Sequence, residues 1–335
     1  MDRRTFRLLL VAAFGSATSL WAGEEVPEAP PGASPARGVL LDAPFSALRL
    51  SFFHAALEVP PIETARTLPP GSLFVQIDSS HARSRKTADE NGIGNLFDGI
   101  FHEWAALDVM AGLLPRLEGG VRIALSGWDE EKDKFFLFDD AGNPIVSDET
   151  LVITGSGSSQ RHDNVSDIVL KLKGLLLEQE DSFLDLGLLG SVKFPIARER
   201  DLTNAGTFDL NIALLASKDL GPVTVHINAG GGFPIGENNL FVDSADIDLN
   251  PFFHGGFGIT WRALESTSVL LQLEGNTSGF KEVDFLDEGP LTIFGGVRQA
   301  FGDFFVEGGA GAGLLRDSSY DFAVQVGVGY LWGWR

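Results

Sequence analysis

The sequence predicts an all-β fold, an antiparallel transmembrane β-barrel of about twelve strands, from three observations. Apolar and polar residues alternate along a dozen segments, the connections between them alternate between short and long, and the tryptophans after residue 22 stand near segment ends. Period-two alternation is typical of a strand whose two faces meet different environments, as lipid and lumen in a barrel. The 40 glycines, 26 phenylalanines and absence of cysteine also favour β structure and leave no disulfide or thiolate metal site.

Residues 1–22 have the pattern of a cleavable signal peptide. Arg3, Arg4 and Arg7 precede an apolar run that ends in small residues near Ala22. Beyond them no uninterrupted apolar run reaches the roughly 18 residues that a spanning helix needs, so a membrane protein made from this chain has to be a barrel. We therefore expect export to the outer membrane of a Gram-negative cell.

Residues 23–71 precede the regular pattern and divide into two parts. Residues 23–38 are rich in proline and small residues, which predicts a flexible linker. Residues 39–71 contain five prolines, too many for a long barrel strand. We expect a short helix and turns inside or beneath the barrel, so that 39–71 is a candidate plug of the lumen.

The barrel itself is predicted over 72–335, and each segment is about as long as a tilted spanning strand. Short connections would be periplasmic turns and long ones external loops. Only the last connection, 316–318, is short where a long one is expected. The predicted strands are 72–83, 101–114, 117–128, 165–177, 182–194, 206–217, 222–233, 250–263, 267–278, 289–300, 303–315 and 319–334.

Charged residues along these segments take the face opposite the aliphatic residues. A lysine or arginine that faces lipid at the membrane midplane costs about 2–4 kcal/mol, so the charged face is assigned to the lumen. By turn counting, Lys173 with Asp185 and Arg298 with Glu307 lie at similar heights, and such pairs either brace a filled lumen or line a narrow pore. The predicted lumen-lining residues are Arg122, Lys171, Lys173, Asp185, Lys193, Asp209, His254, Glu274, Arg298 and Glu307.

Large aromatic residues near strand ends predict the two interfacial girdles of a membrane barrel, because their amphipathic rings prefer the interface. Trp104 and Trp128 fall at predicted external ends. The predicted periplasmic girdle consists of Trp261, Tyr330, Trp332 and Trp334.

Four stretches carry a resemblance to a known family. They are "APFSALRLSFFHAALEVPPIETARTLPPGSLFVQID", "LDVMAGLLPRLEGGVRIALSGW", "GSGSSQRHDNVSDIVLKLKGLLL" and the closing strand. Together they resemble an uncharacterised family of proteobacterial outer-membrane β-barrels that is defined only as a domain of unknown function. The resemblance implies an outer-membrane barrel and brings no activity or catalytic residue. Such barrels usually end on an aromatic residue, whereas Arg335 follows Trp334 here.

The sequence contains no phosphate loop, zinc-binding spacing or nucleotide fingerprint, so we expect no cofactor, metal or catalytic residue. His254 could serve a lipid-modifying enzyme near the external boundary, but a structural histidine is favoured. The net charge of −21 disfavours nucleic acid as a partner. Residues 129–164 carry nine acidic and three basic side chains, a solvated surface or a weak site for cations that bridge to lipopolysaccharide phosphates.

These observations favour a bacterial outer-membrane barrel that acts as a narrow channel or transporter for a small solute. Three alternatives stay open: a structural or surface protein without transport, an outer-membrane lipid-modifying enzyme, and a soluble periplasmic β-sandwich that binds a ligand. The expected partners are outer-membrane lipid and lipopolysaccharide, the barrel-assembly machinery and a small solute.

Overall fold

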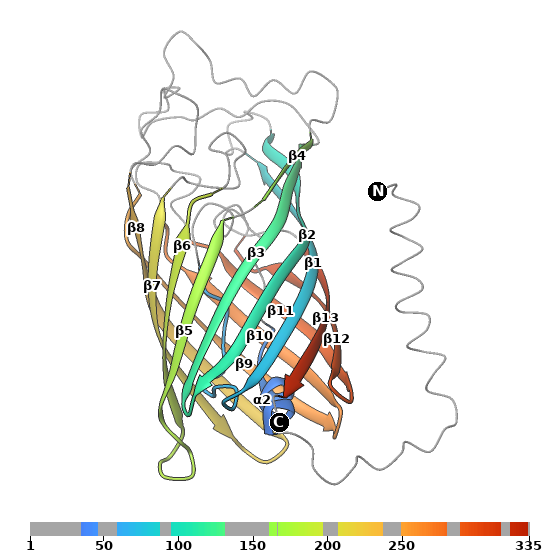
Figure 1. Cartoon of the computed structure of the whole chain (residues 1–335). Helices are drawn as coiled ribbons and strands as arrows, with labels where there is room; N and C mark the ends of the chain where they lie inside the picture. The colour runs from blue at the N-terminus through green and yellow to red at the C-terminus, as the bar shows by residue number, and fades with distance from the viewer. Residues whose placement is uncertain are drawn as a thin grey trace, which may run out of the picture. The chain divides into compact units, whose positions relative to one another are not determined.

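The computed structural model describes residues 35–45, 59–87, 95–130, 161–165, 167–196, 207–236, 249–279, 289–315 and 322–333. The side chains at 84–87, 95–104, 126–130 and 161–165 lie outside this description. The predicted signal peptide and residues 23–34 of the predicted linker also lie outside it. The described strands form one antiparallel barrel with a helix inside its lower end (Figure 1).

Each strand pairs with its neighbours in chain order, and β1 pairs with both β2 and β13. The pairing of β2 with β3 then closes the ring, which excludes a sandwich of two stacked sheets. The strands are β1 (Ser72–Thr87), β2 (Asn95–Leu114), β3 (Leu117–Glu130), β4 (Arg161–Val165), β5 (Ile168–Leu177), β6 (Asp185–Phe194), β7 (Phe208–Asp219), β8 (Val223–Ile235), β9 (Phe252–Leu264), β10 (Thr267–Asn276), β11 (Leu291–Phe301), β12 (Phe304–Gly313) and β13 (Phe322–Gly333).

The short β4 and β5 are two parts of one barrel strand. Both pair with β3, whose Leu125 lies opposite Val165 and whose Arg122 lies opposite Val169. The paired positions differ by four residues along β4 and β5 but by three along β3, so one extra residue is inserted as a bulge. The predicted count of twelve barrel strands is therefore confirmed.

Short and long connections segregate to opposite ends of the barrel. The turns at 115–116, 178–184, 220–222, 265–266 and 302–303 lie at the end where α2 also lies, whereas the longer connections leave the other end (Figure 1). The predicted last connection at 316–318 lies outside the described residues. The described strand β12 ends at Gly313, two residues before the predicted end, and β13 is described from Phe322.

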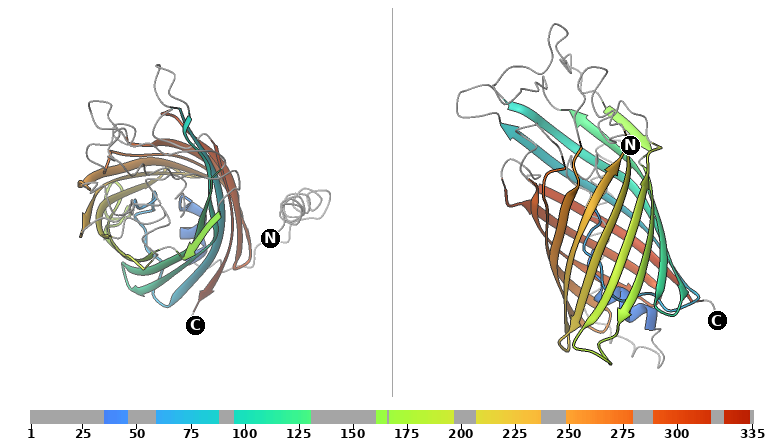
Figure 2. Two further views of the ribbon diagram at one scale, coloured as in Figure 1. Left: turned by 90° about the horizontal axis from the view of Figure 1, so that it is seen from above. Right: turned by 90° about the vertical axis from the view of Figure 1, so that its left-hand side faces the viewer.

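The strand faces are inverted relative to a water-soluble protein. Along β7, Leu210 and Ile212 point outward and are exposed, while Asp209 and Asn211 point inward and are buried. The views in Figure 2 show the ring and its outer wall. Burying charges inside and exposing aliphatic side chains outside is stable only when lipid covers the outside, as in an outer-membrane barrel.

The structure describes the side chains of three of the six predicted interfacial aromatic residues. Trp261, Tyr330 and Trp332 are partly exposed near the end of the barrel that holds the short turns. The rings of Tyr330 and Trp332 lie 4.3 Å apart. Trp104 and Trp128 lie in β2 and β3, but their side chains are outside the described set, as is all of Trp334.

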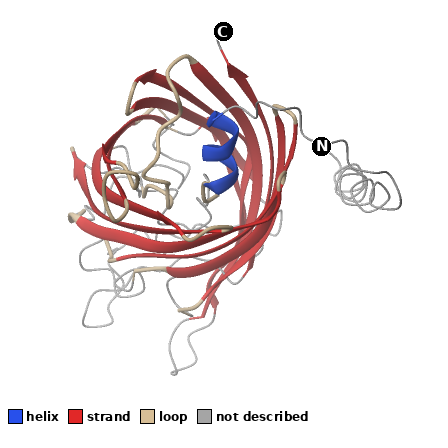
Figure 3. Cartoon of the chain, turned by 90° about the horizontal axis from the view of Figure 1, so that it is seen from below, coloured by secondary structure: helices blue, strands red, loops and turns tan. Residues whose placement is uncertain are grey.

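The described parts of the N-terminal region, 35–45 and 59–71, lie inside the barrel, and we call them the lumen segment (Figure 3). The helix α2 (Pro35–Asp42) begins in the predicted linker, so the last four residues of that linker are helical rather than flexible. Proline suits the first turn of a helix, where its missing N–H is not needed. Among the described residues no helix is long and apolar enough to cross a membrane.

Apolar contacts hold the lumen segment against the wall. Leu40, Leu41 and Leu68 pack with Phe74 and Phe305 of the wall. Higher up, the Phe45 ring meets the Phe294 ring edge to face at 5.2 Å. A Cβ at Gly296 would lie 2.5 Å from the Phe45 ring, so the absence of a side chain there lets the segment approach the wall.

Candidate functional site

The lumen segment and the inner wall meet through buried charges, and Arg66 joins several of them. Its Nε donates to Asp185 Oδ2 on β6 at 2.7 Å, and its Nη2 donates to Asp219 Oδ2 at the end of β7 at 2.6 Å. The Asp42 carboxylate at the end of α2 lies 3.7 Å from Arg66 Nη1. Arg66 therefore links the two parts of the lumen segment to each other and to the wall.

These contacts shift the protonation equilibria of the lumen segment. Burial alone would lower the pKa of Arg66, but hydrogen bonds to Asp219 and Asp185 outweigh burial and hold this pKa above its ordinary value. Burial raises the pKa of Asp42, although its hydrogen bond from Arg262 Nη2, 2.5 Å long, acts in the opposite direction. The guanidinium of Arg66 thus stays charged while the Asp42 carboxyl is more easily protonated.

A second group of charges surrounds Glu63 of the lumen segment. Lys171 Nζ donates to Glu63 Oε1 at 3.0 Å, and Lys173 Nζ lies 3.5 Å from Oε2. Lys173 also pairs with Glu118 at 2.9 Å, and Glu118 accepts the backbone N–H of Leu68 at 2.8 Å. Four charged side chains and one backbone amide therefore join β3, β5 and the lumen segment.

Arg298 on β11 receives the end of the helix α2. It donates to the carbonyl oxygens of Leu40 and Ala43, the latter at 2.8 Å, and its Nε donates to Glu307 at 2.8 Å. The last carbonyls of a helix lack intrahelical partners and carry partial negative charge. A cation from the wall therefore satisfies the C-terminus of α2 and fixes its position.

Ser217 and His226 connect both parts of the lumen segment to the wall through neutral groups. The Ala65 N–H donates to Ser217 Oγ at 2.9 Å, and Ser217 Oγ lies 2.9 Å from His226 Nδ1. His226 Nε2 lies 2.8 Å from the Asp42 carbonyl oxygen. Because a carbonyl can only accept, Nε2 carries the proton and Nδ1 accepts from the serine hydroxyl. Ser217 and both ring nitrogens of His226 therefore have partners among the described residues, and both side chains are at most 1% exposed.

The structure places the predicted lumen residues on the inner wall. Lys171 and Glu274 are half-buried, and the other eight are less than a tenth exposed. Those eight are Arg122, Lys173, Asp185, Lys193, Asp209, His254, Arg298 and Glu307. The wall also holds ion pairs between Arg122 and Asp108 and between Lys193 and Asp209, the latter at 2.7 Å.

One expected charge pair forms and the other does not. Arg298 and Glu307 lie opposite each other in the register of β11 and β12 and form an ion pair at 2.7 Å. Lys173 lies opposite Leu189 rather than Asp185, so the expected pairing is wrong. The bulge between Leu175 and Leu177 and the longer turn at 178–184 displace the register, and each charge instead takes a partner from another strand or the lumen segment.

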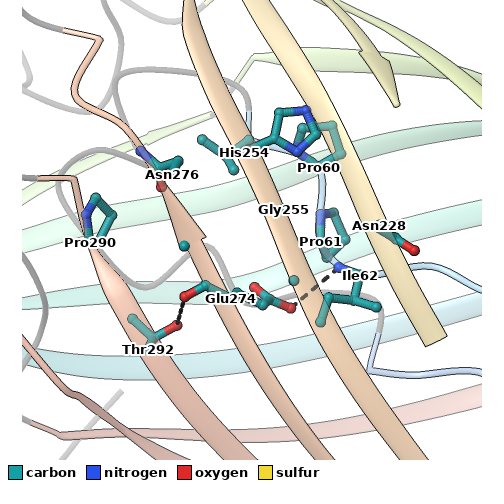
Figure 4. Close-up of a pocket in the computed structure, with 13 residues that line it drawn as sticks. Pro60, Pro61, Ile62, Asn228, His254, Gly255, Glu274, Asn276, Pro290 and Thr292 are labelled. Carbon is teal, nitrogen blue, oxygen red and sulfur yellow. Dashed lines mark hydrogen bonds between the residues drawn. The ribbon is translucent and has the colours of Figure 1, made fainter. Parts of the chain in front are cut away.

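Two recesses lie along the lumen, and residues of the lumen segment line both of them. One is lined by Pro60, Pro61, His254 and Glu274 near the external end (Figure 4). The other lies lower and is lined by Val39, Glu63, Lys171 and Lys173, among others. Ile62 lines both recesses and is 3% exposed. We call the two the upper and the lower recess.

Several residues that join the lumen segment to the wall were not among the predicted lumen residues, including Arg66, Glu63, Ser217 and His226. Arg66 and Glu63 lie in a stretch without alternation, so parity assigns them no face. Ser217 and His226 do lie in predicted strands, but neutral polar side chains also occur on the lumen face of any barrel. Arg66 and Glu63 could have been found from their charge, because they are charged residues in the proline-rich stretch that is predicted to lie inside or beneath the barrel.

We expect acid to weaken docking of the lumen segment through Glu63. Burial would raise the pKa of Glu63, but Lys171 and Lys173 outweigh burial and hold this pKa below its ordinary value of 4.5. A lowered carboxyl pKa gives stability that is present above pH 4.5 and is lost as the pH falls through the lower, docked-state pKa. Glu63→Gln should therefore undock the segment more readily than wild type at pH 7, and the difference should shrink below pH 4.5.

Docking can be followed by thiol labelling, because the chain has no native cysteine. Leu68→Cys places a thiol at a position that is 1% exposed when the segment is docked. The labelling rate is measured between pH 7 and acid in this background with and without Glu63→Gln. A difference between the two that does not change with pH would contradict the assignment to Glu63.

Comparisons with known proteins support the fold and do not assign a family. Neither family models nor curated protein sequences match the chain. Among solved structures, an outer-membrane channel from Pseudomonas putida F1 is similar with a TM-score of 0.63 and 14% identity, covering 82% of this chain and 100% of that chain. The toluene transporter TodX from P. putida matches with a TM-score of 0.40 and 9% identity over 80% and 91% of the two chains.

The translocator domain of the autotransporter NalP from Neisseria meningitidis matches with a TM-score of 0.44 and 7% identity, over 78% of this chain and 88% of that chain. The similarity to the P. putida F1 channel shows that this chain has an outer-membrane β-barrel fold.

Proposed function

We propose that this chain is an outer-membrane channel for a small solute and that its lumen segment is a plug that closes the pathway at rest. The observation that carries the proposal is that the segment lies inside the barrel and that its Ile62 lines both the upper and the lower recess of one lumen. The P. putida F1 channel with a similar fold supports the same function. We also propose that the protein is not an enzyme and that it belongs to an uncharacterised family of proteobacterial outer-membrane barrels.

The polar nature of the docking contacts favours a plug that can leave. Arg66, Glu63 and the backbone of residues 62–65 bind wall groups through ion pairs and hydrogen bonds, which water can replace. A core that served only to brace the barrel could be apolar and would be at least as stable, since buried ion pairs rarely exceed apolar packing in stability. The purely structural alternative predicts that no variant conducts.

The remaining partners follow from the location and are part of the same proposal. The exposed aliphatic face would contact outer-membrane lipid and lipopolysaccharide, and the barrel-assembly machinery would insert a chain exported by a signal peptide at 1–22. A lipid-modifying enzyme is disfavoured because Ser217 and His226, which share a hydrogen bond, are at most 1% exposed and lie on the inner face of the barrel, away from lipid. In the described part of the chain, no cluster of three metal-ligating side chains is present to supply a metal-bound nucleophile.

A reversible disulfide between the plug and the wall should control conductance. Thr64 Oγ1 and Ser217 Oγ lie 3.4 Å apart, so Thr64→Cys with Ser217→Cys places two sulfurs within bonding reach. In planar bilayers we expect the oxidised protein to be closed and the reduced protein to show openings. The single Ser217→Cys variant controls for the lost hydrogen bond to His226.

Two outcomes would contradict the proposal. Equal conductance in the oxidised and reduced states would mean that the segment does not close the pathway. An absence of conductance in the reduced protein, and also in a variant whose segment is undocked, would mean that the barrel is not a channel.

A further inference from the structure

The upper recess contains a carboxylate that is not balanced by a cation. Glu274 on β10 is half-buried, and its Oε1 accepts the Ile62 N–H at 3.3 Å and the Gln272 amide at 2.7 Å (Figure 4). The described residues that line this recess include no lysine or arginine. By contrast, Glu63, Glu118 and Glu307 each have a lysine or arginine within 3.0 Å.

His254 supplies a second polar group to the same recess. It is 7% exposed, and its Nε2 has no hydrogen-bond partner among the described residues. His254 lies opposite Asn276 in the register of β9 and β10, which places it diagonally from Glu274 on the inner face. Diagonal neighbours of this kind are separated by roughly 7–8 Å. A buried, unpaired imidazole nitrogen is costly unless a ligand or water pairs with it.

The rest of the recess is apolar or small. Val59, Pro60 and Pro61 of the lumen segment form one side, and Gly255, Gly256 and Gly275 of the wall form another. A short alkyl group can pack against the proline rings without displacing a polar group. The recess therefore combines one anionic group, one imidazole and an apolar side.

The connections next to the recess would attract cations to it. The one between β8 and β9, 236–251, carries four acidic residues and no basic one in its sequence. The one between β10 and β11, 277–290, carries four acidic residues and one lysine. An excess of acidic residues in the sequence that joins these strands would raise the local concentration of cations.

We propose that the upper recess binds a small organic amine, with its ammonium group at Glu274 and an N–H directed at His254. This assignment rests on the proposed channel function and names its solute class. An ammonium group donates hydrogen bonds and carries the charge that Glu274 lacks a partner for. A metal ion is disfavoured, because no group of three or more metal-ligating side chains occurs in the described residues.

The test uses the full-length protein in detergent and three probes of equal size, propylammonium, propan-1-ol and propionate. Saturation-transfer NMR titrations should show binding of propylammonium and at least tenfold weaker binding of the other two. Glu274→Gln keeps an oxygen for the Ile62 N–H but removes the charge, and should weaken propylammonium binding about tenfold. Glu178→Gln removes an exposed carboxylate at the other end of the barrel and should change nothing.

Two results would overturn the assignment. The first is a wild-type protein that binds propylammonium no better than propan-1-ol, which needs no variant. The second is a folded Glu274→Gln protein, judged by heat-modifiable migration, that binds propylammonium as wild type does. Binding in detergent does not depend on conduction, so the two proposals can fail separately. A protein that binds the amine but never conducts would contradict the channel function and leave the binding site standing. A protein that conducts but does not bind the amine would contradict the binding site and leave the channel function standing.

Discussion

Replacement of Arg66 by glutamine is expected to undock the plug and open the channel. The substitution leaves the carboxylates of Asp42, Asp185 and Asp219 facing one another without the cation that joins them. Breaking a buried ion pair costs about 3–5 kcal/mol, and we expect the lower end, because the Asp219 side chain is 36% exposed to screening solvent. A loss of about 3 kcal/mol shifts the ratio of docked to undocked plug by roughly a hundredfold.

Single-channel recording measures this shift as a rise in open probability, and labelling of Leu68→Cys measures it independently of conduction. Arg116→Gln is the matched control, because Arg116 pairs with Glu178 at 2.8 Å on an exposed turn. Such exposed pairs contribute about 0–1 kcal/mol, so this variant should behave as wild type. If Arg66→Gln labels faster but does not conduct, the assigned docking contacts would stand and the proposed channel function would be contradicted.

Replacement of Lys193 by methionine is expected to destabilise the barrel itself by about 3–5 kcal/mol, because it removes the ammonium group that lies between the buried carboxylates of Asp167 and Asp209. Lys193 Nζ lies 2.7 Å from Asp209 and 3.6 Å from Asp167, and all three side chains are at most 3% exposed. Asp167 also accepts the Ile196 N–H at 2.9 Å beside the bulge that divides β4 from β5. Lys193 therefore links the barrel strand formed by β4 and β5 to β6 and β7 at an irregular point of the wall.

Urea unfolding from lipid vesicles measures this loss, and a double-mutant cycle assigns it to the ion pair. Asp209→Asn removes one of the two buried carboxylates that lose the Lys193 ammonium group in Lys193→Met. The loss of stability in the double variant should therefore be smaller than the sum of the two single losses. Strictly additive losses would mean that Lys193 and Asp209 do not interact in the folded barrel. Arg116→Gln again serves as the control for removal of a surface cation.

Much of the fold followed from local pattern. Residues that alternate between lipid and lumen must do so along every strand, so segments such as 206–217 were located within two residues of β7. Strand ends were less exact, because the external ends of β1, β2 and β3 extend beyond the length that spans a membrane and their residues no longer alternate.

The pairing of charges was predictable only where a short turn fixes the register. Phe301 lies opposite Phe304 across a two-residue turn, so counting three residues back and three forward places Arg298 opposite Glu307. The turn at 178–184 and the bulge beside it break the same count between β5 and β6. Sequence alone therefore predicted one wall pair and mispaired Lys173.

By itself, the sequence determined that this chain forms a barrel of twelve strands with a charged inner face, because period-two alternation has one stable solution in a membrane. Only the tertiary structure decided what those charges hold. Arg66 binds carboxylates that lie 119 and 153 residues further along the chain, and Ile62 reaches Glu274 across 212 residues. Contacts between residues so far apart in the chain depend on how the strands are staggered around the lumen and on where the segment inside it lies. The local alternation of residues carries no information about either.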